Sequence, residues 1–210
     1  STLDGTLFPY TTLFRSQRTE LAIGLLMESF KGRNVKIGVD CAATQFYKDR
    51  KYSLDGKKMT KKGLLDFYLQ LANKYPIVFF EDPFSENDYA GFQSFSEKGE
   101  GRFSVIGDDL LTTNLKRIKE ANKKRACNGA IIKPNQIGTV TETLEAVKLA
   151  KSYGWKIIVS HRSGETMDDF IADLAAGSGA DYIKSGAPSR KERLVKYKRL
   201  ARIERELKLK

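Results

Sequence analysis

The sequence predicts an α/β fold built from six strand–helix units of a parallel barrel. Short apolar runs rich in β-branched residues alternate with segments of helical periodicity. A charged or hydroxyl residue closes each run, and these residues are 41, 27, 25, 27 and 24 positions apart. Strand followed by helix, repeated at such spacings, is typical of parallel strands joined by crossover helices.

The individual elements have their own signals. Thr60 precedes one periodic helical segment, and Thr139 with Glu142 fits the capping box that begins a helix. The long first spacing leaves room for a loop around Lys51–Lys58. The expected strands are residues 35–39, 77–80, 103–106, 130–132, 155–159 and 182–183.

A barrel and an open sheet give similar periodicity, so the two alternatives need a further criterion. A doubly wound open sheet usually carries a glycine-rich dinucleotide fingerprint after a strand, and none is found here. The sequence therefore favours a TIM-type barrel, whose catalytic face lies at the carboxyl ends of the strands. A complete barrel has eight strands, so we expect this one to be partial and to lack two strands at its amino end.

The bulk composition is that of a folded cytoplasmic protein. Hydrophobic residues make up 40%, and no apolar run is long enough to cross a membrane. The two cysteines form no CxxC pair, which suits a reducing compartment and excludes a cysteine zinc site. His161 is the only histidine, which excludes a multi-histidine metal centre.

The positive charge of the chain is concentrated at one end. The formal net charge is +11, and residues 189–210 hold ten Lys or Arg against three Glu. Apolar residues at helical spacing run through the same segment, so we interpret the charges as the solvated face of an amphipathic helix. We expect no nucleic-acid partner, because aromatic interleaving and known binding motifs are lacking. A polyanionic partner remains the alternative.

The amino-terminal segment differs from the rest of the chain. Residues 7–16 read LFPYTTLFRS, which resembles the translation of a sequencing-adapter oligonucleotide. We therefore treat Ser1–Ser16 as a non-native segment and residues 17–210 as one incomplete barrel domain. On this interpretation the chain is a fragment of a longer protein.

Three carboxylates close successive strands and would meet at one rim of the barrel. They are Asp40, Glu81 and Asp108. Oxygen ligands without histidine or thiolate suit Mg²⁺. Each residue taken singly could instead be a helix cap or a surface group, but three in succession favour a metal site.

Two lysines end later strands of the same predicted sheet. Lys133 and Lys184 each follow apolar residues, where a lysine is costly unless it is paired or functional. A nearby metal ion and a second ammonium group would favour the neutral amine, which is a general base. The alternative is that either side chain extends along the surface to solvent.

The run Ser160–Glu165 follows the fifth strand and opens the next helical segment. Arg162, the Ser163 hydroxyl and backbone amides at a helix start form a phosphate cradle. Nucleophilic serine catalysis is the competing interpretation. It is disfavoured because no GxSxG elbow is present and His161 has no second histidine to assist it.

Several motifs, in this order, resemble the enolase family, over about Thr19 to Leu207. They are GVDCAA at 38–43, FEDPF at 80–84, GDDL at 107–110, Lys133 with NQIG at 135–138, SHRSGET at 160–166 and IKSG at 183–186. The resemblance implies phosphopyruvate hydratase activity, a lyase reaction of glycolysis that reversibly dehydrates 2-phosphoglycerate to phosphoenolpyruvate with bound Mg²⁺.

The resemblance also assigns roles to individual residues. Lys133 would remove the C2 proton of the substrate, and Lys184 would bind the substrate and support this base. The metal would be held by Asp40, Glu81 and Asp108, of which Glu81 and Asp108 would also face the substrate. The remaining substrate contacts would come from His161, Arg162 and Ser163.

The chain departs from the family pattern in one important respect. The general acid of the family, a glutamate in a glycine-rich segment upstream of Asp40, has no counterpart, so we expect the fragment alone to be inactive. The resemblance implies a homodimeric parent protein in the cytoplasm, with some relatives secreted or on cell surfaces. An alternative is a non-catalytic half-barrel that binds plasminogen or a polyanion through its basic end, including Lys210. Another Mg²⁺-dependent barrel lyase is disfavoured by the long enolase-like motifs.

Overall fold

The computed structural model of the chain describes residues 18–208. The adapter-like segment Ser1–Ser16 and the terminal Lys210 lie outside these residues, and the interpretations given to them stay predictions. The elements, in chain order, are α2 (Thr19–Ser29), β1 (Ile37–Asp40), η1 (Ala43–Phe46), β2 (Tyr47–Lys48), β3 (Lys51–Leu54), β4 (Lys57–Met59), α3 (Lys61–Lys74), β5 (Ile77–Glu81), α4 (Tyr89–Gly99), β6 (Ser104–Gly107), α5 (Leu115–Lys123), β7 (Gly129–Ile132), α6 (Pro134–Ile137), α7 (Val140–Ser152), β8 (Lys156–Ser160), α8 (Phe170–Ser178), β9 (Tyr182–Lys184) and α9 (Lys191–Lys208).

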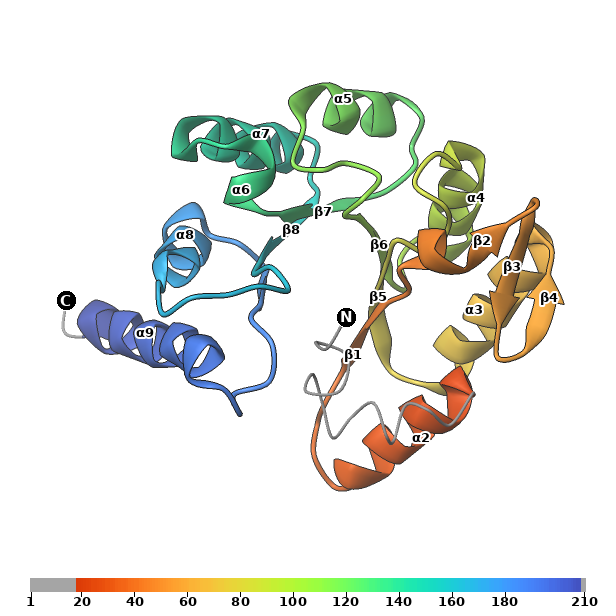
Figure 1. Cartoon of the computed structure of the whole chain (residues 1–210), viewed down its shortest axis with the longest axis horizontal. Coiled ribbons are helices and arrows are strands. Elements are labelled where there is room, and N and C mark those ends of the chain that lie inside the picture. The colour runs from red at the N-terminus through yellow and green to blue at the C-terminus, as the bar shows by residue number, and fades with distance from the viewer. Residues whose placement is uncertain (1–17, 209–210) are drawn as a thin grey trace.

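Six parallel strands form the main sheet, in the order β1-β5-β6-β7-β8-β9. The strands line the inside of an open ring and the helices lie outside it (Figure 1). The ring opens between α2 and α9, the helices beside the two end strands β1 and β9. The predicted α/β fold, a half-barrel of the TIM type, is confirmed.

Contacts between the two ends of the sheet show how strongly it curves. β5 and β9 are not neighbours in the sheet, yet the rings of Phe79 and Tyr182 lie 5.7 Å apart between centroids. Lys184 at the end of β9 donates a 2.6 Å hydrogen bond to Asp40 at the end of β1. In a flat sheet three strands would lie between β5 and β9 and four between β1 and β9, so the curvature of a barrel brings these residues together.

The core lies on both faces of the sheet. Between the strands and the outer helices, the aromatic side chains of Phe80, Phe95 and Phe103 pack with ring centroids 4.9–5.1 Å apart. On the inner face, Ile106, Ile131 and Ile158 of three neighbouring strands form a second apolar layer. Inward-facing residues from adjacent strands fill a barrel interior in this way, so the centre is packed rather than open.

The predicted helix starts are confirmed, but the predicted loop at 51–58 is not. Thr60 Oγ1 accepts a hydrogen bond from the Gly63 N–H, and Thr139 Oγ1 accepts one from the Glu142 N–H. In place of the loop, β2, β3 and β4 form a small antiparallel sheet. An Asp55-Gly56 turn with positive φ at both residues joins β3 to β4, the turn that a two-residue hairpin favours.

The charged residues of helix α9 agree only in part with the sequence-based expectation. We interpreted its charges as a solvated face, and most of them are exposed, but Arg193 is only 8% and Lys196 only 1% exposed. Both cations remain buried because loop carbonyl groups accept their hydrogen bonds. The helices of residues 18–208, α9 included, are too short or too polar to cross a membrane.

Candidate functional site

The predicted strand-end residues all lie at the carboxyl ends of the sheet strands. β1, β5, β8 and β9 end at Asp40, Glu81, Ser160 and Lys184, while β6 and β7 are followed directly by Asp108 and Lys133. Since parallel strands present their carboxyl ends at one edge of a barrel, these six side chains share one rim. We call this set of residues the rim.

Lys184 joins the two ends of the rim. Its Nζ donates to Asp40 Oδ2 at 2.6 Å and to the two carboxylate oxygens of Glu81 at 2.9 and 3.0 Å. Burial alone would lower the pKa of Lys184, but the charges of Glu81 and Asp40 outweigh it and raise this pKa. Glu81 is only 1% exposed, and burial, reinforced by the charge of Asp40, raises its pKa to about 8. The Lys184 ammonium therefore counteracts the effect of burial on Glu81.

A second ion pair lies on the next part of the rim. Lys133 Nζ donates to Asp108 Oδ2, and both side chains are largely buried. The Lys133 N–H donates to Thr113 Oγ1 at 3.0 Å, and this hydroxyl donates to Gln136 Oε1 at 2.8 Å. Thr113 has a left-handed backbone (φ 53°) and is fully buried. The backbone that carries Lys133 is therefore held by Thr113, which is itself bonded to Gln136.

Asp82, which the sequence did not single out, links two strand ends. Its Oδ1 accepts the Asp108 N–H at 2.9 Å and its Oδ2 accepts the Asp109 N–H at 2.7 Å. Burial raises the pKa of Asp82 to about 7, although these two N–H groups act against the shift. The signal that could have identified it is the paired acid in EDP and GDD, where Glu81 and Asp108 each have a second acid beside them.

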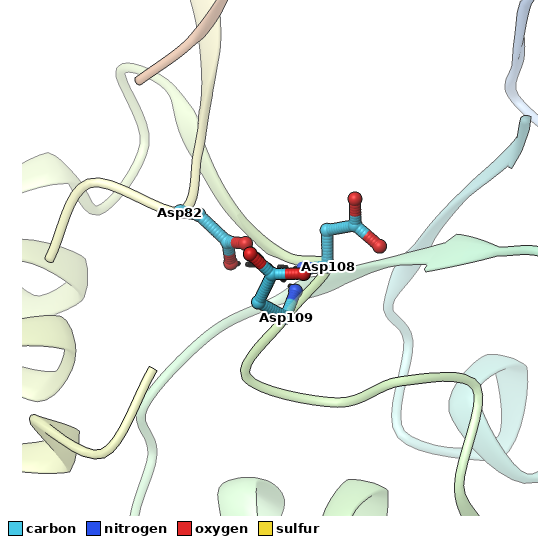
Figure 2. Close-up of side chains that lie close together, drawn as sticks. All are labelled: Asp82, Asp108 and Asp109. Carbon is cyan, nitrogen blue, oxygen red and sulfur yellow. Dashed lines mark hydrogen bonds between the residues drawn. The ribbon is translucent and has the colours of Figure 1, made fainter. Parts of the chain in front are cut away.

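Asp82, Asp108 and Asp109 are also close enough to hold a metal ion, with one oxygen from each within 4.8 Å of the others. Figure 2 shows the carboxylates of Asp82 and Asp109 next to each other, with the Asp108 side chain directed away from them. Because both Asp82 oxygens accept backbone N–H groups, this carboxylate is already used to fix the loop after β6.

The predicted metal ligands fit a hard divalent cation by their chemistry. Asp40, Glu81 and Asp108 offer only carboxylate oxygens, the donors that Mg²⁺ prefers. The structure already gathers positive charge there, because the Lys184 ammonium lies between Asp40 and Glu81 and the Lys133 ammonium lies on Asp108. In the structure each of these three carboxylates forms an ion pair with one of the two ammonium groups. Their assignment as metal ligands stays a prediction.

The predicted phosphate residues lie on the segment between β8 and α8, residues 161–169, which we call the rim loop. Arg162 Nη1 donates to Asn135 Oδ1 at 3.1 Å, so its guanidinium reaches the helix that follows Lys133. Ser163 and His161 line a cavity of about 140 Å³ with Gly186. Burial, together with the charges of Arg193 and Lys184, lowers the pKa of His161 to about 4, so the imidazole is neutral at physiological pH.

The fold and the rim together define a class: a (β/α) barrel protein with acidic and basic side chains gathered at the carboxyl ends of its strands. Residues 18–210 match the family model described as "Enolase, C-terminal TIM barrel domain". The chain belongs to the enolase family.

Full-length relatives carry the same name. The chain is 46% identical over 193 residues to an enolase of Sulfurisphaera tokodaii, a match that covers 90% of this chain and 46% of the relative. It is 49% identical over 173 residues to an enolase of Aeropyrum pernix, covering 82% and 40%, and 49% identical over 185 residues to enolase B of Dictyostelium discoideum, covering 82% and 42%. The chain thus spans about half the length of the curated relatives it matches.

Proposed function

We propose that the protein to which this chain belongs is a Mg²⁺-dependent enolase that interconverts 2-phosphoglycerate and phosphoenolpyruvate. Membership of the enolase family supports this proposal. The observation that carries it is the rim itself, where three ion pairs bring Lys133 against Asp108 and Lys184 against Asp40 and Glu81. Few structural roles require five ionisable side chains at the ends of five strands.

The proposed reaction requires a base and a way to stabilise the anion that forms. Lys133 accepts the proton from C2 of the substrate, and Lys184 holds the substrate carboxylate from the other end of the rim. When bound by Asp40, Glu81 and Asp108, Mg²⁺ supplies positive charge beside that carboxylate and makes the weak carbon acid easier to ionise. The general acid of the family, which the resemblance places upstream of Asp40, would donate a proton to the C3 hydroxyl. This hydroxyl leaves as water, and the electron pair left at C2 forms the double bond between C2 and C3.

The rim loop supplies the contacts to the phosphate in this proposal. Arg162 offers a planar set of N–H donors and Ser163 a hydroxyl, which together suit the oxygens of a phosphate group. His161 is neutral and lines a cavity with Ser163. The phosphate therefore fixes the position of C2 relative to Lys133 without taking part in the bond changes.

The experiment uses the longest natural reading frame that contains residues 17–210. We expect the purified protein to form phosphoenolpyruvate from 2-phosphoglycerate, to stop when a chelator removes the metal, and to recover when Mg²⁺ is returned. Turnover that is unaffected by chelation, or no turnover on either substrate with Mg²⁺ present, would contradict the proposal. We propose that the chain of 210 residues alone is inactive, because it has no recognised counterpart of the family's general acid, and Mg²⁺-dependent turnover by this chain would contradict that part of the proposal.

A further inference from the structure

Arg193 of α9 binds the rim loop through three different acceptors. Its Nη1 donates to the His161 Nδ1 and to the Arg162 carbonyl oxygen at 3.0 Å, and its Nη2 donates to the Ser163 carbonyl oxygen at 2.9 Å. The side chain is almost fully buried. Burying a guanidinium costs free energy unless its N–H groups donate hydrogen bonds. Arg193 is therefore stable here only when the loop places its carbonyl oxygens within reach.

Lys196, one turn further along α9, holds the other part of the same loop. Its Nζ donates to the Thr166 carbonyl oxygen at 2.7 Å and to the Glu192 carbonyl oxygen at 2.7 Å, and it forms an ion pair with Glu165. At 1% exposure it is among the most buried charged side chains of the described residues. Positions three apart on a helix lie on one face, so Arg193 and Lys196 act on the loop from the same side.

The rim loop depends on these side chains because its own backbone forms no regular structure. The Arg162 N–H donates to a Glu165 side-chain oxygen at 3.4 Å, and the His161 N–H donates to the Lys184 carbonyl oxygen at 2.9 Å. Loop conformation with few backbone hydrogen bonds is the least stable part of a fold unless side chains hold it. Here the side chains come from α9.

We propose that Arg193 and Lys196 are positioning residues that hold the rim loop in the conformation in which Arg162 and Ser163 receive a phosphate. The proposal rests on the proposed function for the identity of the ligand, but not for the order of the loop. α9 lies beside α8 (Figure 1), and Arg199 already joins these helices through an ion pair with Asp173 at 2.5 Å. Other contacts, such as the one between Arg199 and Asp173, therefore hold α9 against α8, whereas Arg193 and Lys196 contact the rim loop.

The first part of the test reads the order of the loop without any ligand. His161 is the only histidine of the chain, so its ring nitrogens give unambiguous NMR signals. Arg193 has no acceptor, so Nδ1 must accept and the neutral ring must carry its proton on Nε2. The charged groups facing the ring are Arg193 from α9, Lys184 from β9 and Glu165 from the loop.

We expect Arg193→Gln to change the His161 tautomer ratio and to return its titration towards the ordinary value of about 6.5. Amide hydrogen exchange in residues 161–166 should rise on the order of tenfold in Arg193→Gln and in Lys196→Met. Arg193→Lys keeps the charge but has fewer donors, so we expect an intermediate result. Arg199→Gln is the matched control, because it loosens α9 from α8 and leaves the loop contacts intact.

The second part adds inorganic phosphate to the same variants. We expect the wild-type loop amides to shift on titration and Arg193→Gln to bind phosphate at least about tenfold more weakly, with Arg199→Gln unchanged. An ordered wild-type loop that ignores phosphate would support the positioning role and count against the proposed phosphate site. Unchanged loop exchange and an unchanged His161 ring in Arg193→Gln, with the variant folded by circular dichroism, would overturn the inference.

Discussion

Gly186 shows, at the scale of single residues, how closely the rim loop and α9 are packed. Its φ is +76°, and a Cβ there would lie 3.0 Å from His161 Cε1 and 3.1 Å from Arg193 Cδ. We expect Gly186→Ala to lower the free energy of unfolding by about 1–3 kcal/mol, since a left-handed backbone and a crowded Cβ both act against it. Urea denaturation measures the change.

Gly177 in α8 is a control site, at which alanine should not lower the free energy of unfolding. Nothing lies within 4 Å of a Cβ at this position, and its backbone is helical. Gly177→Ala should leave stability unchanged or raise it by about 0.5–1 kcal/mol, because alanine has the higher helix propensity. Equal effects from the two substitutions would show that the packing around Gly186 is not what the structure describes.

His161 gives the fold a dependence on pH. Its pKa is lowered to about 4 in the folded state, so protonation favours the unfolded chain, where histidine has its ordinary value near 6.5. The stabilising contribution is complete above pH 6.5 and is lost as the pH falls towards 4. Because the ring is partly exposed, solvent screening limits the loss to on the order of 1 kcal/mol at pH 5.

A comparison with His161→Gln separates the contribution of His161 to the pH dependence of stability from that of the carboxylates. Burial raises the pKa of Glu81 and of Asp82, so these groups favour folding at low pH and act in the opposite direction. We expect the free energy of unfolding to fall between pH 7 and pH 5 more steeply for the wild type than for His161→Gln. Parallel pH profiles for the two proteins would contradict a histidine held neutral by its surroundings.

At the scale of elements, the sequence predicts the barrel strands well and the small sheet poorly. Four of the six sheet strands, β5, β6, β7 and β8, are largely buried, and all six end at or next to the polar residue that the spacing indicates. A loop was expected around residues 51–58, where β3 and β4 lie, because the long spacing between Asp40 and Glu81 leaves room for one. The Asp55-Gly56 turn was the available signal, together with the alternation that buries Tyr52.

Contacts between elements could not be predicted from periodicity. A helical pattern shows which residues of α9 are apolar, but not that loop carbonyls would accept hydrogen bonds from Arg193 and Lys196. The partners of Asp82 could not be predicted for the same reason, since they are the backbone N–H groups of Asp108 and Asp109, directly after β6. Backbone acceptors and donors leave no trace in side-chain identity.

Substitution of Asp82 tests the link between the ends of β5 and β6. Asp82→Ala leaves two N–H groups without their acceptor in a largely buried region, and alanine is disfavoured at a φ of 42°. We expect a loss of about 3 kcal/mol or more in the free energy of unfolding. Asp82→Asn retains one carbonyl oxygen and tolerates the left-handed backbone, so it should cost roughly half as much. Denaturant unfolding of both variants measures these losses. A loss of under about 1 kcal/mol for Asp82→Ala would contradict the proposed link between β5 and β6.

At the scale of the whole molecule, the sheet has two ends that are not paired with each other. β1 and β9 are the outer strands of the described sheet, and Tyr182 of β9 is 43% exposed. Unpaired edges associate with other chains, so we expect the chain of 210 residues to self-associate as its concentration rises. Size-exclusion chromatography with light scattering measures this. Tyr182→Lys places a charge on the edge and should reduce association, whereas a monomeric wild type at all concentrations would contradict the expectation.

In the proposed reaction, Lys133 on the rim removes the proton from C2 of 2-phosphoglycerate. The most direct measurement is the exchange of that proton with deuterium from the solvent, followed by NMR in the longest natural reading frame with Mg²⁺ present. We predict that the wild type exchanges the proton, that Lys133→Ala is slower by about 10²–10⁴, and that Lys148→Ala on the exposed face of α7 matches the wild type. Exchange by Lys133→Ala at the wild-type rate would contradict the account.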